Sequence, residues 1–206
     1  TLLILTGAGS RNEKNEELNE RMKQDRDQVI GYIKTAGKPV VDSLSPTMEL
    51  LSPNSYERGG WVLHMLRREL GDSVFHLSVR SYYEQYKGKN ADTKDLQTVF
   101  EKVSGKKLDI FFRQWLYTAE IPKLDITWKY NLDKKELMVT VKQLQKNGSF
   151  NFPLAIYIQS WGSSNASIPV ITVTKEQETF IFPLATKPVI IKIDPYVGIK
   201  GWTKPN

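Results

Sequence analysis

The chain contains no cysteine among its 206 residues. This absence excludes disulfide bonds, thiol nucleophiles and metal sites that use cysteine ligands. It does not fix the compartment, because secreted and cytosolic proteins can both lack cysteine. The compartment therefore stays unknown, with a periplasmic or secreted location favoured over a cytoplasmic one.

Long apolar runs and blocks of like charge are also missing. The apolar run Leu2–Leu5 is far shorter than the roughly 20 residues that span a bilayer, so we expect no membrane segment in this chain. The net charge of +6 arises from 29 basic and 23 acidic residues that are dispersed along the sequence. Nucleic-acid binding requires a concentrated basic surface. We therefore expect a solvated exterior and no nucleic-acid partner.

Helix-forming patterns occupy the first part of the chain. Apolar residues recur at helical spacing over the stretches 12–34, 61–70, 74–86, 93–103 and 108–117. In the third stretch the inward-facing candidates are Phe75, Val79, Tyr82, Tyr83 and Tyr86. The proline-rich segment 39–53 is expected to run extended over a surface. Short links between the later helices predict antiparallel neighbours packed into a bundle.

The composition changes at Ile121 and Pro122. Beyond this point, apolar and polar residues alternate with the period of strands that bury one face. Turn-forming residues such as Asn147-Gly148 separate these runs. Six or seven short strands at this spacing predict an antiparallel β-sandwich. The predicted fold class is α+β with two domains, an α-helical bundle over 1–121 and a β-sandwich over 122–206.

Tyr56 is the candidate catalytic residue. It precedes the helical pattern that begins at Trp61, on a segment predicted to be a loop. A phenol held near a carbonyl can donate a hydrogen bond to the oxygen that gains charge as water attacks, and such donors lower the barrier. The other interpretation is that Tyr56 is a partly buried aromatic residue that packs ahead of a helix. The spacing alone leaves both interpretations open.

The residues around Tyr56 also resemble a family motif. Tyr56-Glu57-Arg58-Gly59 is similar to the Tyr-x-Lys/Arg-Gly segment of zinc aminopeptidases of the aminopeptidase N type, a gluzincin family that includes leukotriene hydrolase. The resemblance continues in the family's order through the helix at 62–71, the run 111–116 that ends in Gln-Trp-Leu, and the start of a β-sandwich at Pro122. It implies that the helices are the carboxy-terminal half of a thermolysin-like catalytic domain, in which Tyr56 stabilises the transition state.

The zinc-binding residues of that family are missing from this sequence. Family members hold zinc with His-Glu-x-x-His and a later glutamate, whereas the only histidines here are His64 and His76, outside that pattern. No metal ligand and no cofactor-binding residue is assigned in this chain. The chain also starts at Thr1 without an initiator methionine. We therefore expect a carboxy-terminal piece of a metallo-aminopeptidase, inactive by itself, whose parent binds zinc and removes amino-terminal residues from peptides.

The expected partners are a peptide substrate in the intact protein and the remainder of the same catalytic domain. The alternative function is a naturally metal-free binding or scaffolding module built from the same helices and β-sandwich. Other features have simpler interpretations. His64 and His76 are expected to be structural, the stretch 7–12 lacks the third glycine of a dinucleotide loop, and Asp194 is expected to form a turn.

Overall fold

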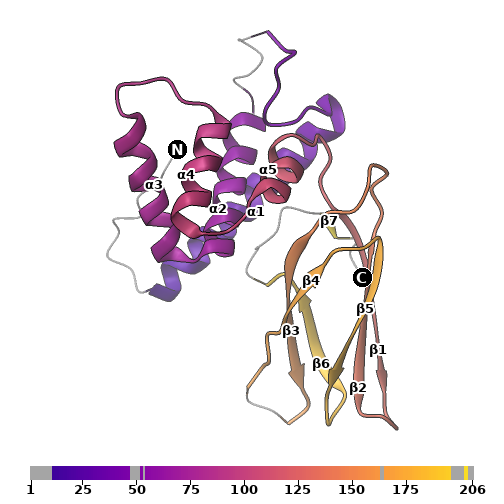
Figure 1. The fold of residues 1–206 in the computed structure, drawn as a ribbon. Coiled ribbons are helices and arrows are strands. Elements are labelled where there is room, and N and C mark those ends of the chain that lie inside the picture. The colour runs from indigo at the N-terminus through magenta and orange to yellow at the C-terminus, as the bar shows by residue number, and fades with distance from the viewer. Residues whose placement is uncertain (1–10, 47–51, 53, 163–164, 196–201, 204–206) are drawn as a thin grey trace. The chain divides into compact units, whose positions relative to one another are not determined.

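The computed structural model describes residues 11–46, 52, 54–162, 165–195 and 202–203. The chain divides into two compact units, residues 1–119 and residues 120–206, which Figure 1 shows as a group of helices and a group of strands. This combination confirms the predicted α+β fold class. Within the described ranges, no helix combines the length and the apolar character that crossing a bilayer requires.

The first unit is built from helices. In chain order they are α1 (Arg11–Ala36), the short π-helix η2 (Asn54–Arg58), α2 (Gly59–Leu70), α3 (Asp72–Tyr86), α4 (Thr93–Ser104) and α5 (Asp109–Leu116). Each α-helix lies on a stretch whose apolar spacing predicts one, so these predictions are confirmed. α3 packs against both α4 and α2, as the short links between them predict.

Local signals set the ends of these helices. At the start of α4, Asp92 accepts a hydrogen bond from the backbone N–H of Asp95 at 2.9 Å, and Asp95 accepts one from the N–H of Asp92 at 3.0 Å. This capping box satisfies two donors that the helix leaves free. α4 ends at Gly105, whose φ of 69° lies in the left-handed region that glycine adopts without a steric cost.

The core of the helical unit is largely aromatic. Its largest fully buried apolar side chains are Trp61, Trp115, Phe100 and Phe112. Phe75 meets Phe100 edge to face, with 5.8 Å between ring centroids, an arrangement that aromatic pairs favour. The prediction for α3 is wrong at Tyr83, which is 64% exposed. Ser78, which lies one turn after Phe75, is buried instead. The buried face of the helix therefore runs through Phe75 and Ser78, and position 83 lies outside it.

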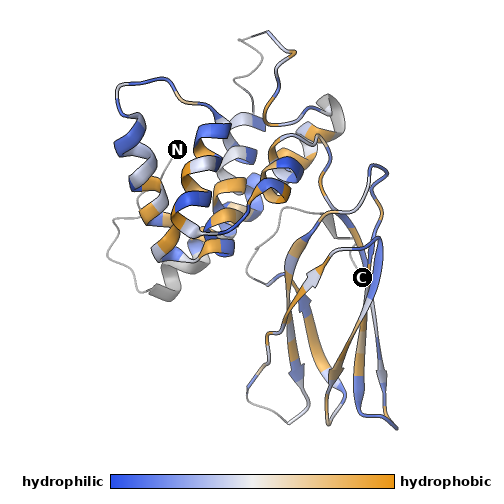
Figure 2. Cartoon of the chain, in the orientation of Figure 1, coloured by the Kyte–Doolittle hydropathy of each residue, from blue (hydrophilic) through white to orange (hydrophobic). Residues whose placement is uncertain are grey.

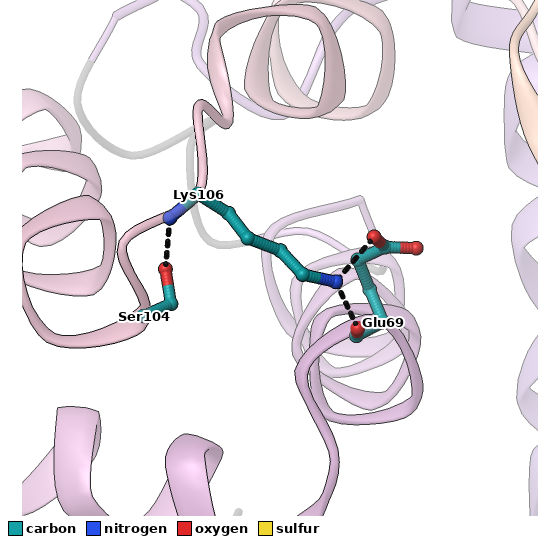
Figure 3. A network of polar contacts seen from close by, with 3 residues as sticks. All are labelled: Glu69, Ser104 and Lys106. Carbon is teal, nitrogen blue, oxygen red and sulfur yellow. Dashed lines mark hydrogen bonds and ion pairs between the residues drawn. The ribbon is translucent and has the colours of Figure 1, made fainter.

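Lys106 links the end of α2 to the segment between α4 and α5 (Figure 3). Its ammonium donates to the backbone carbonyl of Glu69 at 2.9 Å and to the Glu69 carboxylate at 3.1 Å. The Lys106 N–H donates to the hydroxyl of Ser104 at 3.2 Å. A cation at this position satisfies a carbonyl in the last turn of α2 and complements the negative end of the helix dipole. The contact therefore ties two helix ends together.

The second unit consists of two sheets. Its strands are β1 (Lys123–Asn131), β2 (Glu136–Gln143), β3 (Phe152–Ser160), β4 (Val170–Val173), β5 (Gln177–Pro183), β6 (Pro188–Ile193) and β7 (Trp202–Thr203). The order is β5-β2-β1-β7 in one sheet and β4-β3-β6 in the other. Pairing is antiparallel except between β1 and β7, which are parallel. The predicted antiparallel pattern is wrong there, because β7 follows a strand of the other sheet and no hairpin sets its direction.

β1 and β2 bury alternate residues, as their pattern predicts, whereas β3 buries Leu154, Ala155 and Ile156 in succession. On β2, Leu137, Val139 and Val141 are fully buried, and Figure 2 shows hydrophobic and hydrophilic residues interleaved along the strands. β6 departs from the prediction, since Val189 is 50% exposed. The pairing of β3 with β6 is irregular between Gln159 and Ser160, opposite the start of β6, and such a bulge changes which face a side chain occupies.

The buried side-chain amide of Gln143 forms a hydrogen-bond network at the end of β2. Gln143, the last residue of β2, is only 2% exposed. Its Nε2 donates to the carbonyls of Phe150 at 2.9 Å and Lys175 at 3.0 Å, and its Oε1 accepts from the Phe150 N–H at 2.9 Å and from Gln145 Nε2 at 2.8 Å. The side chain of Gln143 thus joins the end of β2 to the segments that lead into β3 and β5.

Candidate functional site

Tyr56 lies at the centre of η2, directly before α2. The sequence predicts a loop here, and the structure has a π-helical turn instead, a conformation that is rare and often marks functional sites. The backbone N–H groups of Ser55 and Tyr56 donate to the Ser52 carbonyl at 2.9 Å and 3.2 Å. Tyr56 is 56% exposed, so solvent reaches the residue while part of its surface is covered, and the packing alternative stays open beside the catalytic one. Its assignment as the catalytic residue stays a prediction.

Two buried polar side chains hold η2 from its ends. Asn54 and Arg58, the first and last residues of the turn, are 3% and 0% exposed. Asn54 Nδ2 donates to the carbonyls of Lys38 at 3.2 Å and Pro39 at 2.5 Å. Both acceptors follow the end of α1. Asn54 therefore anchors the start of the turn to the segment that leaves the first helix.

Arg58 reaches two separate segments of the helical unit. Its Nη1 donates to the carbonyls of Lys38 at 3.2 Å and Ala119 at 3.0 Å, and its Nη2 donates to the carbonyl of Thr118 at 2.5 Å. A fourth bond joins Nη1 to Asn54 Oδ1 at 3.4 Å. We call these four hydrogen bonds, together with the two that Asn54 Nδ2 donates, the carbonyl clasp. It connects η2 to the residues after α1 and to the residues after α5.

Burial has a measurable electrostatic consequence at Arg58. Because the guanidinium is removed from water, its pKa is lowered to about 10. The group therefore remains charged at neutral pH. The four acceptors named in the clasp are neutral oxygen atoms, and their hydrogen bonds compensate part of the lost hydration.

The segment that supplies the first acceptors is itself ordered. The Val41 N–H donates to the Leu116 carbonyl at 3.0 Å. Asp42 Oδ1 accepts from the N–H groups of Leu44 at 2.9 Å and Ser45 at 3.2 Å. Hydrogen bonds from the side chain of Ser45 and the backbone of Leu44 lower the pKa of Asp42. The segment is therefore a folded turn and not a simple extended connection, as far as its described residues show.

A shallow polar hollow lies beside the start of η2. Its walls are formed by Tyr32, Lys38, Pro39, Asp42, Ser52, Asn54 and Ser55. Tyr56 is not among these residues, so the hollow and the exposed phenol are separate features of the same turn. Among the described residues of the turn, the exposed phenol of Tyr56 can donate and accept hydrogen bonds, and the backbone that carries it is held at both ends.

The other sequence candidates do not join Tyr56. The His64 ring lies edge-on to Trp61, 5.9 Å between centroids, and the His76 ring lies against Phe75 at 5.7 Å, so both histidines make aromatic contacts within their helices. Asp194 follows β6 with a φ of 48°, which suits the turn predicted for it. The glycine-rich stretch 7–12 lies almost wholly outside the described residues.

The described part of the chain holds no cluster of three or more His, Cys, Asp or Glu side chains that could bind a metal ion. The zinc ion that the family resemblance implies therefore finds no ligand set there. The residues that sequence reasoning missed are Asn54 and Arg58 as structural anchors. One signal was present, since an Asn and an Arg four positions apart lie on one side of a helical turn. Their carbonyl acceptors, however, come from distant segments.

The sequence of the helical unit matches a known family. A profile of the "Peptidase family M1 domain" matches residues 6–115, a range that includes α1 to α4, η2 with Tyr56, and α5 up to its last residue but one. The chain belongs to peptidase family M1. This membership confirms the resemblance to aminopeptidases of the aminopeptidase N type. Within the family match, the segment around Tyr56 is the point where an exposed phenol and a buried guanidinium lie two residues apart.

Curated M1 peptidases match parts of this chain. Aminopeptidase N of Lactococcus lactis subsp. lactis is 36% identical over 67 residues, which cover 32% of this chain and 8% of that protein. Aminopeptidase N of Escherichia coli (strain K12) is 24% identical over 166 residues, which cover 70% of this chain and 19% of that protein. The chain thus spans less than a quarter of the length of these two relatives.

A solved structure shows the same fold. It is described as the crystal structure of Legionella pneumophila aminopeptidase A in complex with aspartic acid, and it superposes with a TM-score of 0.72 at 18% identity. The match covers 88% of this chain and 21% of that one. At this identity the similarity concerns the fold, in which helices are followed by antiparallel sheets.

Proposed function

We propose that this chain is the carboxy-terminal part of the catalytic domain, followed by the β-sandwich, of a zinc metallo-aminopeptidase that removes amino-terminal residues from peptides. Membership of peptidase family M1 and the aminopeptidase names of its relatives support this proposal. The observation that carries it is the exposed phenol of Tyr56 on a turn whose two ends are anchored by buried side chains.

Tyr56 is the catalytic residue in this proposal. Its hydroxyl donates a hydrogen bond to the carbonyl oxygen of the scissile peptide bond while water attacks the carbonyl carbon. That oxygen gains negative charge in the transition state, so the hydrogen bond from Tyr56 strengthens as the reaction proceeds. A donor fixed before the reaction needs no reorganisation, and loss of one such donor lowers kcat by roughly 100- to 1,000-fold in measured cases.

Other parts of the full-length protein complete the site in this proposal. The described residues offer zinc no ligand set, so the proposal assigns the metal and the general base that activates water to segments outside this chain. No metal-dependent step is assigned to the chain itself. The proposed partners are the remainder of the catalytic domain and a peptide substrate. The isolated chain is expected to be inactive, because a phenol alone does not activate water.

Substitution of Tyr56 in the full-length protein tests the proposal. Tyr56→Phe removes only the hydroxyl, so kcat for a chromogenic amide of an amino acid should fall by roughly 100-fold or more, with little change in bound zinc. Tyr83→Phe is the matched control, since Tyr83 is also exposed but lies on α3, and it should retain wild-type kcat. An unchanged kcat in Tyr56→Phe would reject the catalytic role.

A further inference from the structure

We propose that Arg58 is a positioning residue of the peptidase site, which fixes the turn that carries Tyr56 by means of its buried hydrogen bonds to the backbone. This inference rests on the proposed function of Tyr56. Arg58 does not itself contact substrate in the proposal. It acts through η2, whose central residue is Tyr56 and whose last residue is Arg58.

The carbonyl acceptors of the clasp come from two segments of the chain. Lys38 and Pro39 lie after α1, and Thr118 and Ala119 lie after α5. These two segments are distant in sequence, and the hydrogen bond from the Val41 N–H to the Leu116 carbonyl joins them. Arg58 adds η2 to the same junction. The orientation of the turn is therefore set relative to two helices at once.

The burial of Arg58 has an energetic cost. A guanidinium that is completely buried loses its hydration, which is costly for a charged group, and hydrogen bonds to carbonyl groups replace part of that hydration. Apolar side chains of similar volume often serve stability as well as buried charges do. An arginine at this position is therefore explained by the geometry it imposes. Its planar fork of donors meets several carbonyls at fixed angles, which an apolar side chain cannot do.

Neighbouring residues of η2 differ in their exposure to solvent. Asn54 and Arg58 are buried, while Tyr56 between them is 56% exposed. The clasp thus holds the backbone on both sides of a phenol that remains accessible. A displacement of about 1 Å in a catalytic group can lower the rate by about 100-fold, so loss of the clasp should reduce turnover even if the protein stays folded.

The test compares Arg58→Met, Arg58→Lys and Arg80→Met in the full-length protein. Methionine fills the buried volume without donating, and lysine restores a charged donor with fewer hydrogen bonds. Arg80 is an exposed arginine on α3 and serves as the control for loss of a positive charge. We expect kcat to fall by roughly 10- to 100-fold in Arg58→Met with KM nearly unchanged, to recover in part in Arg58→Lys, and to stay at the wild-type value in Arg80→Met.

A second readout does not depend on activity. With 3-fluorotyrosine placed at position 56, the ¹⁹F signal should broaden or shift in Arg58→Met and return toward the wild-type signal in Arg58→Lys. Circular dichroism shows whether each variant is folded. If Arg58→Met is folded and leaves both kcat and the ¹⁹F signal unchanged, the positioning role is refuted. The role is also refuted if the loss of kcat matches the loss of folded protein, or if lysine restores neither readout.

The same measurements separate this inference from the proposal on which it rests. If Tyr56→Phe retains full activity while the ¹⁹F signal still responds to Arg58→Met, the catalytic role of Tyr56 is refuted. Arg58 then positions a turn that does not act in catalysis, so its role as a positioning residue of the peptidase site is refuted as well. If Tyr56→Phe is inactive and Arg58→Met is fully active, only the role of Arg58 fails.

Discussion

Replacement of Gln143 by methionine should destabilise the β-sandwich strongly. Methionine keeps much of the side-chain length but cannot form the four hydrogen bonds that the Gln143 amide makes with Phe150, Lys175 and Gln145. A buried hydrogen bond contributes about 1 kcal/mol net, so the free energy of unfolding should fall by about 3 to 4 kcal/mol. That is a large share of the roughly 5 to 15 kcal/mol by which domains are stable.

A urea titration measures the loss of stability, and hydrogen–deuterium exchange shows in which of the two structural units of the chain the loss occurs. Peptides from β2 and β3 report the β-sandwich, while peptides from α2 and α4 report the helical unit. Gln177→Met is the matched control, because Gln177 is exposed and its strand pairing uses only the backbone; its effect should stay within about 0.5 kcal/mol. A loss below about 1 kcal/mol in Gln143→Met would refute the assigned importance of the network.

Two further predictions concern the helical unit. Asp92→Ala removes the hydrogen-bond acceptor at the start of α4 and should lower the free energy of unfolding, measured by urea titration, by about 1 kcal/mol. An effect no larger than that of an exposed substitution away from helix ends would contradict this prediction. Asp42 has a lowered pKa, so its hydrogen bonds stabilise the folded state above the unfolded pKa of about 4 and are lost as the pH falls through the folded pKa. Wild type should therefore lose more stability than Asp42→Asn on acidification, as thermal melts at pH 5 and pH 2.5 would show. Parallel losses would exclude this linkage.

Features that depend on neighbouring residues could be predicted from the sequence. α4 is an example, since Asp92 at its start, Gly105 at its end and the spacing of Val99 and Phe100 all give local signals. The strand β2 is another, because Leu137 and its alternate neighbours repeat with the period of the pleat. In both cases the pattern and the structure obey the same short-range geometry.

Features that depend on distant partners could not be predicted. Arg58 is polar, and its residue type predicts a surface position; the carbonyls after α1 and α5, which are distant in sequence, help to make its burial possible. Gln143 is buried for the same kind of reason, with acceptors before β3 and β5. The π-helical turn at Tyr56 was likewise predicted as a loop, because five residues contain no periodicity that distinguishes the two.

The complete burial of the Arg58 guanidinium also determines how the turn responds to ionic strength. Salt screens charges that water surrounds, such as the half-exposed pair of Arg67 and Asp72, but mobile ions do not reach a group with 0% exposure. The orientation of the turn that carries Tyr56 should therefore be the same at low and at high ionic strength.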